Sequence, residues 1–206
     1  MTKSVSDAIS MWDISSPESA GYAPLDGDAN TDVAIVGGGY TGCSTALHLA
    51  GHNVSSIILE AEDVGYGGSG RNAGLLNAGL WLPPEQVLDV LGKQAGSHLV
   101  DLLGAGPQYV FSLIEKYQIR CEATRNGTIH AAHAPSGMAD LTNRYNQWHK
   151  LGAPVELLDR QQAQDKIGSS AFHGGLLDRR AGTINPMGYA RGLARAAVSA
   201  GARLHT

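Results

Sequence analysis

Three glycines with a characteristic spacing offer the clearest chemistry in this chain. Gly37, Gly39 and Gly42 lie in the run GGGYTG and fit the pattern G-x-G-x-x-G. The first glycine permits a tight turn from strand to helix, the second lets the backbone approach a pyrophosphate, and the third lets the helix pack on the strand. Tyr40 and Thr41 fall at the start of that helix, whose free N–H groups would face the phosphates. The spacing therefore predicts a dinucleotide site.

An acidic residue follows at the distance that a dinucleotide site requires. Glu60 lies 18 residues after Gly42, at the end of the predicted strand 54–59. A carboxylate there can accept hydrogen bonds from both ribose hydroxyls, and it would repel the 2′-phosphate of NADP. NAD and FAD both satisfy these two motifs. A glycine-rich turn in an unrelated α/β protein is the alternative interpretation.

A second glycine-rich stretch, GYGGSGRNAGLLNAG at 65–79, bears on the choice between NAD and FAD. FAD is the longer cofactor, and its ribityl chain and ring system need additional close approach of the backbone, which glycine permits. The stretch therefore favours FAD, with a flexible surface loop as the alternative. The groups that could contact FAD are small side chains, N–H donors, one cation and one amide. They belong to Ser69, Arg71, Asn72 and Gly74.

The elements that must position these residues alternate between strand and helix. A β-branched run at 31–36, a helix ending near Gly51 and a strand at 54–59 form a βαβ unit, which favours parallel pairing of its strands. The rest of the chain mixes both types. Helices are predicted over 85–91, 96–117, 136–151, 160–167 and 187–200, with a further break at 104–107, and strands over 127–132, 154–158, 172–177 and 202–206.

Two segments lack a regular pattern. Residues 1–30 are rich in Ser, Asp, Pro and Gly and are interpreted as a mostly irregular arm, which Trp12, Tyr22 and Leu25 can pin to the domain. Residues 65–79 contain too many glycines for a regular helix or strand.

Composition argues against several classes of function. The chain has 206 residues, of which 43% are hydrophobic and 17% charged, enough to bury the core of one domain or one and a half. Its net charge of −4 and lack of basic runs argue against a nucleic-acid partner. We expect no membrane association, since neither a secretory signal nor a transmembrane stretch is recognisable. Two cysteines make no disulfide framework, so a cytoplasmic location is expected.

Other reactive residues carry weaker signals. His130 and His133 are three residues apart, but on a predicted strand and loop this spacing puts them on opposite faces, so no metal site is predicted. Cys43 is more consistent with a small buried side chain than with a redox thiol. No acid–base pair or nucleophile stands out, and the catalytic residues stay unassigned.

The run DVAIVGGGYTG, followed by LEAEDVG and GGSGRNAG, resembles the N-terminal part of the D-amino-acid-oxidase-like FAD oxidoreductases, the group of the glycine and sarcosine oxidases. Within that group it is most similar to the gamma-glutamylputrescine oxidases. The resemblance covers 31–206, including the later stretch GGLLDRRAGTINPMGYARGLARAAVSAGARLHT. It departs from the usual pattern at Cys43, Gly68 and Ala73, where one small or apolar residue replaces another.

The resemblance implies an α/β fold in which a Rossmann-type FAD-binding βαβ domain is interrupted by an α+β substrate domain and truncated at the C-terminus. On this basis we divide the chain into an N-terminal arm (1–30), an FAD-binding unit with the second glycine loop (31–80), part of a substrate domain (81–180) and an incomplete return to the FAD-binding domain (181–206).

The resemblance also implies a chemistry. The flavin of FAD would take a hydride from the carbon next to the nitrogen of a small amine or amino acid, and dioxygen would reoxidise it to give hydrogen peroxide. A truncated, inactive dinucleotide-binding fragment and an NAD-dependent dehydrogenase remain the alternatives. Carried over by position, the pyrophosphate would meet Gly37, Gly39 and Gly42, the adenosine ribose would meet Glu60, and the path towards the flavin would follow Ser69, Arg71, Asn72 and Gly74.

Overall fold

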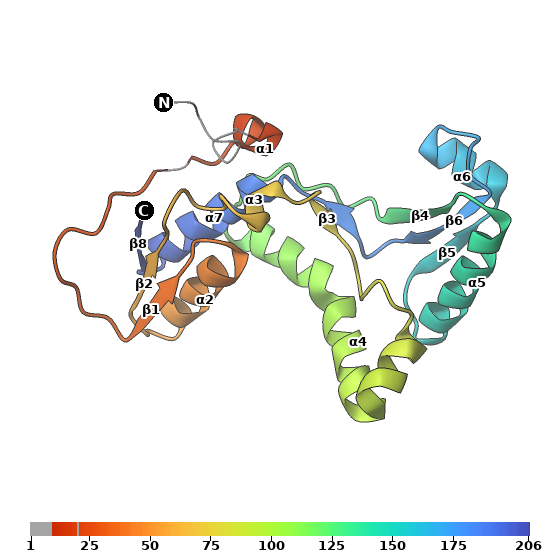
Figure 1. The fold of residues 1–206 in the computed structure, drawn as a ribbon, viewed down its shortest axis with the longest axis horizontal. Helices are drawn as coiled ribbons and strands as arrows, with labels where there is room; N and C mark the ends of the chain where they lie inside the picture. Colours follow the sequence, from red (N-terminus) through yellow and green to blue (C-terminus); the bar gives the residue numbers. More distant parts are fainter. Residues whose placement is uncertain (1–9, 20) are drawn as a thin grey trace. The chain divides into compact units, whose positions relative to one another are not determined.

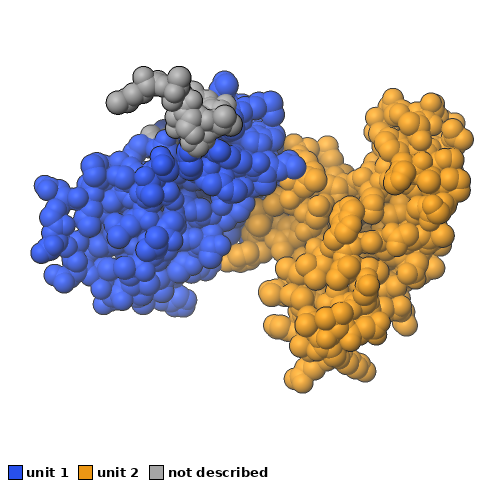
Figure 2. Space-filling model, in the orientation of Figure 1, with its two compact units in different colours: residues 1–74, 111–123, 184–206 blue, residues 75–110, 124–183 orange. Residues whose placement is uncertain are grey.

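The computed structural model describes residues 10–19 and 21–206, and the chain divides into two compact units. Unit 1 comprises the described residues up to Gly74 together with Phe111–Ala123 and Ile184–Thr206, and unit 2 comprises Leu75–Val110 and Thr124–Thr183. Figure 2 colours the two units separately. The domain assignments made from the sequence stay predictions. Each unit is described below by itself.

A parallel three-stranded sheet forms the centre of unit 1 (Figure 1). Strand β2 (Ser56–Leu59) lies between β1 (Val33–Val36) and β8 (Arg203–His205), and it is buried along most of its length. Helix α2 (Tyr40–Gly51) connects β1 to β2. This arrangement confirms the predicted βαβ unit with parallel strands.

Helix α7 (Pro186–Ser199) packs against α2 and is buried along most of its length. Asn185 caps its first turn by accepting the Gly188 N–H at 2.9 Å, and proline fits the first helical position because no N–H is needed there. Alanine and glycine occupy many buried positions of α7, so neighbouring segments can approach it closely. Two short helices, α1 (Met11–Ser15) and α3 (Gly68–Arg71), also belong to unit 1.

An antiparallel three-stranded sheet forms the centre of unit 2. Strand β6 (Gly174–Asp178) lies between β4 (Thr128–Ala132) and β5 (Val155–Leu158). Helices α5 (Pro135–Lys150) and α6 (Arg160–Ile167) pack on this sheet, and apolar side chains between them form the core of the unit.

Three further elements complete unit 2. The short antiparallel pair of β3 (Leu75–Leu76) and β7 (Gly182–Thr183) lies where the chain enters and leaves the unit. Helix α4 (Pro84–Lys116) begins in unit 2 and ends in unit 1. Neither α4 nor any other helix in the described part of the chain combines the length and apolar character needed to cross a membrane.

One of the two breaks predicted in α4 is wrong. The backbone leaves helical geometry at Gly92 (φ 76°, ψ 163°), which matches the predicted gap after residue 91, whereas residues 104–107 are helical. Pro107 cannot donate to the carbonyl four residues earlier. That carbonyl, of Leu103, instead accepts the Gly79 N–H at 3.1 Å, so the proline leaves no unsatisfied oxygen and the helix continues.

Two segments predicted to be irregular contain short regular elements. The arm includes the five-residue helix α1, and the glycine-rich stretch 65–79 includes α3 and β3. Both short helices contact α7, so their stability comes from tertiary packing rather than from the propensity of their residues.

Candidate functional site

The turn between β1 and α2 has the geometry that the glycine spacing predicts. Gly37 has a φ of +104°, and its N–H donates to the Leu59 carbonyl oxygen at 2.8 Å. A Cβ on Gly42 would lie 2.0 Å from the Gly37 oxygen, so α2 can approach the turn only with glycine there. Gly39 is the N-cap of α2. The turn therefore leads directly into the first N–H groups of the helix, which favour an anion.

The second glycine-rich stretch meets this turn at the start of α2. The Tyr40 N–H donates to Ser69 Oγ at 3.0 Å, and the Gly65 N–H donates to the Gly38 oxygen at 3.1 Å. Thr41 is exposed on the same first turn of the helix. Two stretches that the sequence only suggested as parts of one site are therefore brought together within unit 1.

Glu60 lies at the carboxyl end of β2, beside the glycine turn. Its Oε2 accepts the Gly38 N–H at 2.5 Å, and its Oε1 accepts the Glu62 N–H at 3.1 Å. Each bond occupies one lone pair and leaves another for a hydroxyl donor. A diol placed beside the turn would therefore meet two carboxylate oxygens that are already oriented.

Asn72 holds the second glycine stretch in shape. Its Nδ2 lies 3.1 Å from the Gly68 oxygen and 3.0 Å from the Ser69 oxygen, and its Oδ1 accepts the Gly74 N–H at 2.8 Å. The same Nδ2 lies 3.2 Å from the Tyr40 hydroxyl. One amide side chain therefore ties the loop to itself and to the first residue of α2.

The loop also depends on close packing, which the sequence did not reveal. A Cβ on Gly70 would lie 2.3 Å from Met187 Cε of α7 and 2.3 Å from the Gly65 oxygen. The guanidinium carbon of Arg71 lies 4.4 Å from the centre of the Tyr66 ring, a cation–π contact at the surface. Some glycines of this stretch thus serve packing on α7 rather than approach to a ligand.

The assembled residues match the ADP half of a dinucleotide. The start of α2 suits a pyrophosphate, and the Glu60 carboxylate suits a ribose diol. A family model described as DAO, FAD dependent oxidoreductase, matches residues 32–206. The chain belongs to this family. Its membership confirms the resemblance found in the sequence and decides between NAD and FAD in favour of FAD.

Curated relatives of this DAO-family chain show how much of their own length it spans. It is 35% identical to gamma-glutamylputrescine oxidoreductase of Escherichia coli (strain K12), over 89% of this chain and 44% of the relative. It is 32% identical to the probable oxidoreductase OrdL of Rhizobium meliloti (strain 1021), over 98% of this chain and 47% of the relative. The chain therefore spans under half the length of these curated relatives.

A solved structure confirms the fold class. The crystal structure of glycine oxidase from Geobacillus kaustophilus matches with a TM-score of 0.70 at 29% sequence identity, covering 84% of this chain and 46% of that one. The Rossmann-type α/β arrangement expected from the sequence is thus shared with an oxidase of known structure.

Tyr40 and Cys43, which follow the glycine turn on α2, pack within unit 1. The Tyr40 ring lies 5.3 Å from that of Tyr189, a residue that sequence reasoning did not single out, and its hydroxyl donates to the Pro186 oxygen at 3.2 Å. Cys43 is buried, and this burial, followed by the nearby Glu60 charge, raises the pKa of its thiol to about 12. The thiol therefore stays protonated near neutral pH and acts as a packing group.

Unit 2 of the DAO-family chain contains a cavity of about 510 Å³, a volume typical of small-ligand sites. Trp81 in its wall is 70% exposed, and its ring lies 4.7 Å from that of His130. Burial, and then the charge of Arg144, lower the pKa of His130, so its imidazole is neutral at pH 7. This cavity could not be predicted from the sequence because its walls come from separate segments, namely 75–81, β4, α5 and β6.

Proposed function

We propose that the chain forms the FAD-binding part of an oxidoreductase that oxidises the C–N bond of a small amine or amino acid. The observation that carries this proposal is the meeting of three features at one end of the unit 1 sheet: the start of α2, the Ser69 loop and the Glu60 carboxylate. A helix start and a fixed carboxylate are complementary to a pyrophosphate and a ribose. Membership of the DAO family gives FAD as the cofactor.

Each of these groups would contact a different part of the cofactor. The N–H groups in the first turn of α2, apart from that of Tyr40, would donate to the pyrophosphate. Ser69 accepts the Tyr40 N–H through its oxygen and keeps its own O–H available for a phosphate oxygen. Glu60 would accept the ribose hydroxyls. Further residues proposed to contact the cofactor are Gly37, Gly39, Thr41 and Gly42 at the turn and Arg71, Asn72 and Gly74 along the loop.

The substrate class is inferred from the relatives. Their names refer to gamma-glutamylputrescine and to glycine, both small compounds with an amino group. When bound, FAD would accept a hydride from the carbon next to the amine nitrogen, and dioxygen, the proposed final acceptor, would be reduced to hydrogen peroxide. In this scheme the described residues of unit 1 bind and orient the cofactor, and the catalytic residues stay unassigned.

Retention of FAD by the purified chain is the first test. We expect the visible flavin absorbance bands to stay with the protein through gel filtration. Glu60→Gln keeps the size of the side chain and removes its charge, so it should weaken FAD binding at least about ten-fold, since a hydrogen bond to a charged group contributes about 1.5–3 kcal/mol. Fluorescence titration with FAD measures this change.

The exposed neighbour Glu62 provides the matched control, because Glu62→Gln removes the same charge without touching the turn. A chain that retains no flavin, or a Glu60→Gln variant that binds FAD as tightly as Glu62→Gln, would contradict the proposed cofactor site. Amine-dependent release of hydrogen peroxide by the FAD-loaded protein would test the electron acceptor separately.

A further inference from the structure

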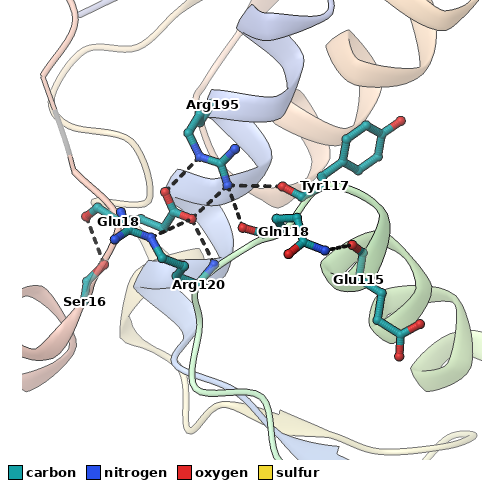
Figure 3. Close-up of polar contacts among 7 residues, drawn as sticks. All are labelled: Ser16, Glu18, Glu115, Tyr117, Gln118, Arg120 and Arg195. Carbon is teal, nitrogen blue, oxygen red and sulfur yellow. Dashed lines mark hydrogen bonds and ion pairs between the residues drawn. The ribbon is translucent and has the colours of Figure 1, made fainter.

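A buried carboxylate anchors the N-terminal arm to unit 1. Glu18 is 3% exposed, and its two oxygens accept hydrogen bonds from the Arg195 guanidinium at 2.9 and 3.0 Å. The Arg120 N–H donates to the same carboxylate at 2.9 Å (Figure 3). Burial raises the pKa of Glu18, but the hydrogen bonds from Arg195 and Arg120 lower this pKa by more than burial raises it. The carboxyl group therefore has a pKa below its ordinary range. The arm is therefore fixed to α7 through an ionised group.

Two further polar contacts join the arm to α7. Asp13 Oδ1 lies 2.6 Å from Arg191 Nη2, and Ser15 Oγ accepts from Asn185 Nδ2 at 3.0 Å. Asn185 is 1% exposed, and its Oδ1 already caps α7, so its amide nitrogen needs acceptors inside the protein. Ser15 supplies one of them, and Glu122 Oε2 supplies another at 3.3 Å. The arm thus satisfies a buried polar group at the start of α7.

Helix α1 fixes the position of Trp12 beside the second glycine loop. Ser10 Oγ accepts the Asp13 N–H at 3.2 Å, and Asp13 Oδ2 accepts the Ser10 N–H at 3.3 Å, which forms a capping box. In this helix the Trp12 Nε1–H donates to the backbone carbonyl oxygen of Asn72 at 3.0 Å. The arm therefore contacts the residue whose side chain holds the loop in shape.

Helix α7 supports the same loop directly. Met187 occupies the space that a Cβ on Gly70 would need, and the Ile184 N–H, just before the helix, donates to the Gly74 oxygen at 2.9 Å. The loop is thus held both by α7 and by the arm, and the arm is itself attached to α7. Loosening the arm would remove one of these two supports.

We propose that residues 10–18 act as a clamp that holds the loop 68–74 in the conformation that binds FAD, with Trp12 as a positioning residue that acts through Asn72. This inference rests on the proposed function, because it concerns the same cofactor site. It requires reciprocal coupling: an ordered clamp strengthens FAD binding, and bound FAD strengthens the order of the clamp by the same factor. An arm that only stabilised the fold would show no such reciprocity.

Trp12→Phe tests the clamp, because it removes the Nε1–H donor and keeps an aromatic ring. In fluorescence titrations of the full chain, the FAD dissociation constant should rise about five-fold, the effect of losing one hydrogen bond. Amide hydrogen exchange should become faster at 68–74 and stay unchanged in the central strand β2. Ile14→Ser is the control, since this side chain lies on the same helix and is 79% exposed, and it should change neither quantity.

The reciprocal effect is measured on the arm itself. Saturating FAD should slow amide exchange at 10–18 in the wild-type protein, and less so in Trp12→Phe. A variant with wild-type FAD affinity and wild-type exchange at 68–74 would overturn the clamp. Amide exchange at 68–74, compared between the wild type and Trp12→Phe without FAD, tests the clamp independently of cofactor binding. Failure of the wild-type chain to retain FAD would count only against the proposed function.

Discussion

Gly42 and Gly70 illustrate two different demands that close packing places on single residues. Gly42 lets α2 approach the Gly37 carbonyl, and Gly70 lets Met187 of α7 pack against the second loop. The first demand arises inside one short motif, so the spacing of the glycines predicts it. The second joins residues far apart in the sequence, and only the fold reveals it.

Gly42→Ala tests the first of these demands. Its Cβ would lie 2.0 Å from the Gly37 oxygen and 3.2 Å from Ile35 Cγ2, so the backbone of the turn must shift. We expect the free energy of unfolding to fall by about 2–3 kcal/mol and FAD binding to be lost. Urea unfolding followed by circular dichroism measures the first effect, and flavin retention measures the second.

Gly51, the last residue of the same helix, provides the control. A Cβ there would meet no atom within 4 Å, so Gly51→Ala should leave FAD binding intact and raise the free energy of unfolding by up to about 1 kcal/mol. Equal stability of the two alanine variants would show that the turn tolerates a side chain and that the close approach is not essential.

At the scale of elements, the sequence predicted those whose signals are local. The β-branched run, the glycine turn and the acidic strand end lie within thirty residues and identify β1, α2, β2 and the candidate site together. Helix α1 was not predicted, because the residues that support it, Arg191 and Asn72, are distant from it in the sequence. The wrongly predicted break at Pro107 has the same origin, since the compensating N–H comes from Gly79. Trp12 was expected to pin the arm, but its partner could not be foreseen.

The attachment of the arm to α7 should depend on pH. Burial raises the pKa of Glu18, but its donors on Arg195 and Arg120 lower it to below the ordinary value of 4.5. A carboxyl group with a lowered pKa in the folded state stabilises the fold above its unfolded-state pKa, and this contribution is lost as the pH falls through the folded-state pKa. Glu18→Gln should therefore lower the free energy of unfolding by about 1–2 kcal/mol at neutral pH.

The difference in the free energy of unfolding between the wild type and Glu18→Gln should stay constant at pH values above the ordinary pKa of glutamate. It should shrink as the solution is made more acidic. Urea unfolding at a series of pH values measures it. Glu115 is an exposed carboxylate on α4, so Glu115→Gln serves as the control. Its free energy of unfolding should match that of the wild type at every pH. A difference that persists unchanged in strong acid would mean that the Glu18 charge contributes nothing to the attachment.

At the scale of the whole chain, the two edges of the unit 1 sheet differ in how they are covered. Thr206 Oγ1 donates to the Tyr22 oxygen at 2.7 Å, and His205 Nδ1 lies 3.1 Å from the Ala23 oxygen, so the arm lies against the β8 edge. At the opposite edge, Val36 of β1 is 89% exposed. An exposed apolar side chain on an edge strand invites pairing with a strand of another molecule.

We therefore expect the 206-residue chain to self-associate through β1. Val36→Lys should suppress this association, because pairing would bury a charge, and it should change the free energy of unfolding by less than about 0.5 kcal/mol at so exposed a position. Sedimentation velocity at increasing protein concentration measures the association. Val198→Lys on α7 adds the same charge at a partly exposed site away from the edge strand and should associate like the wild type. Equal suppression by both variants would assign the effect to net charge rather than to the β1 edge.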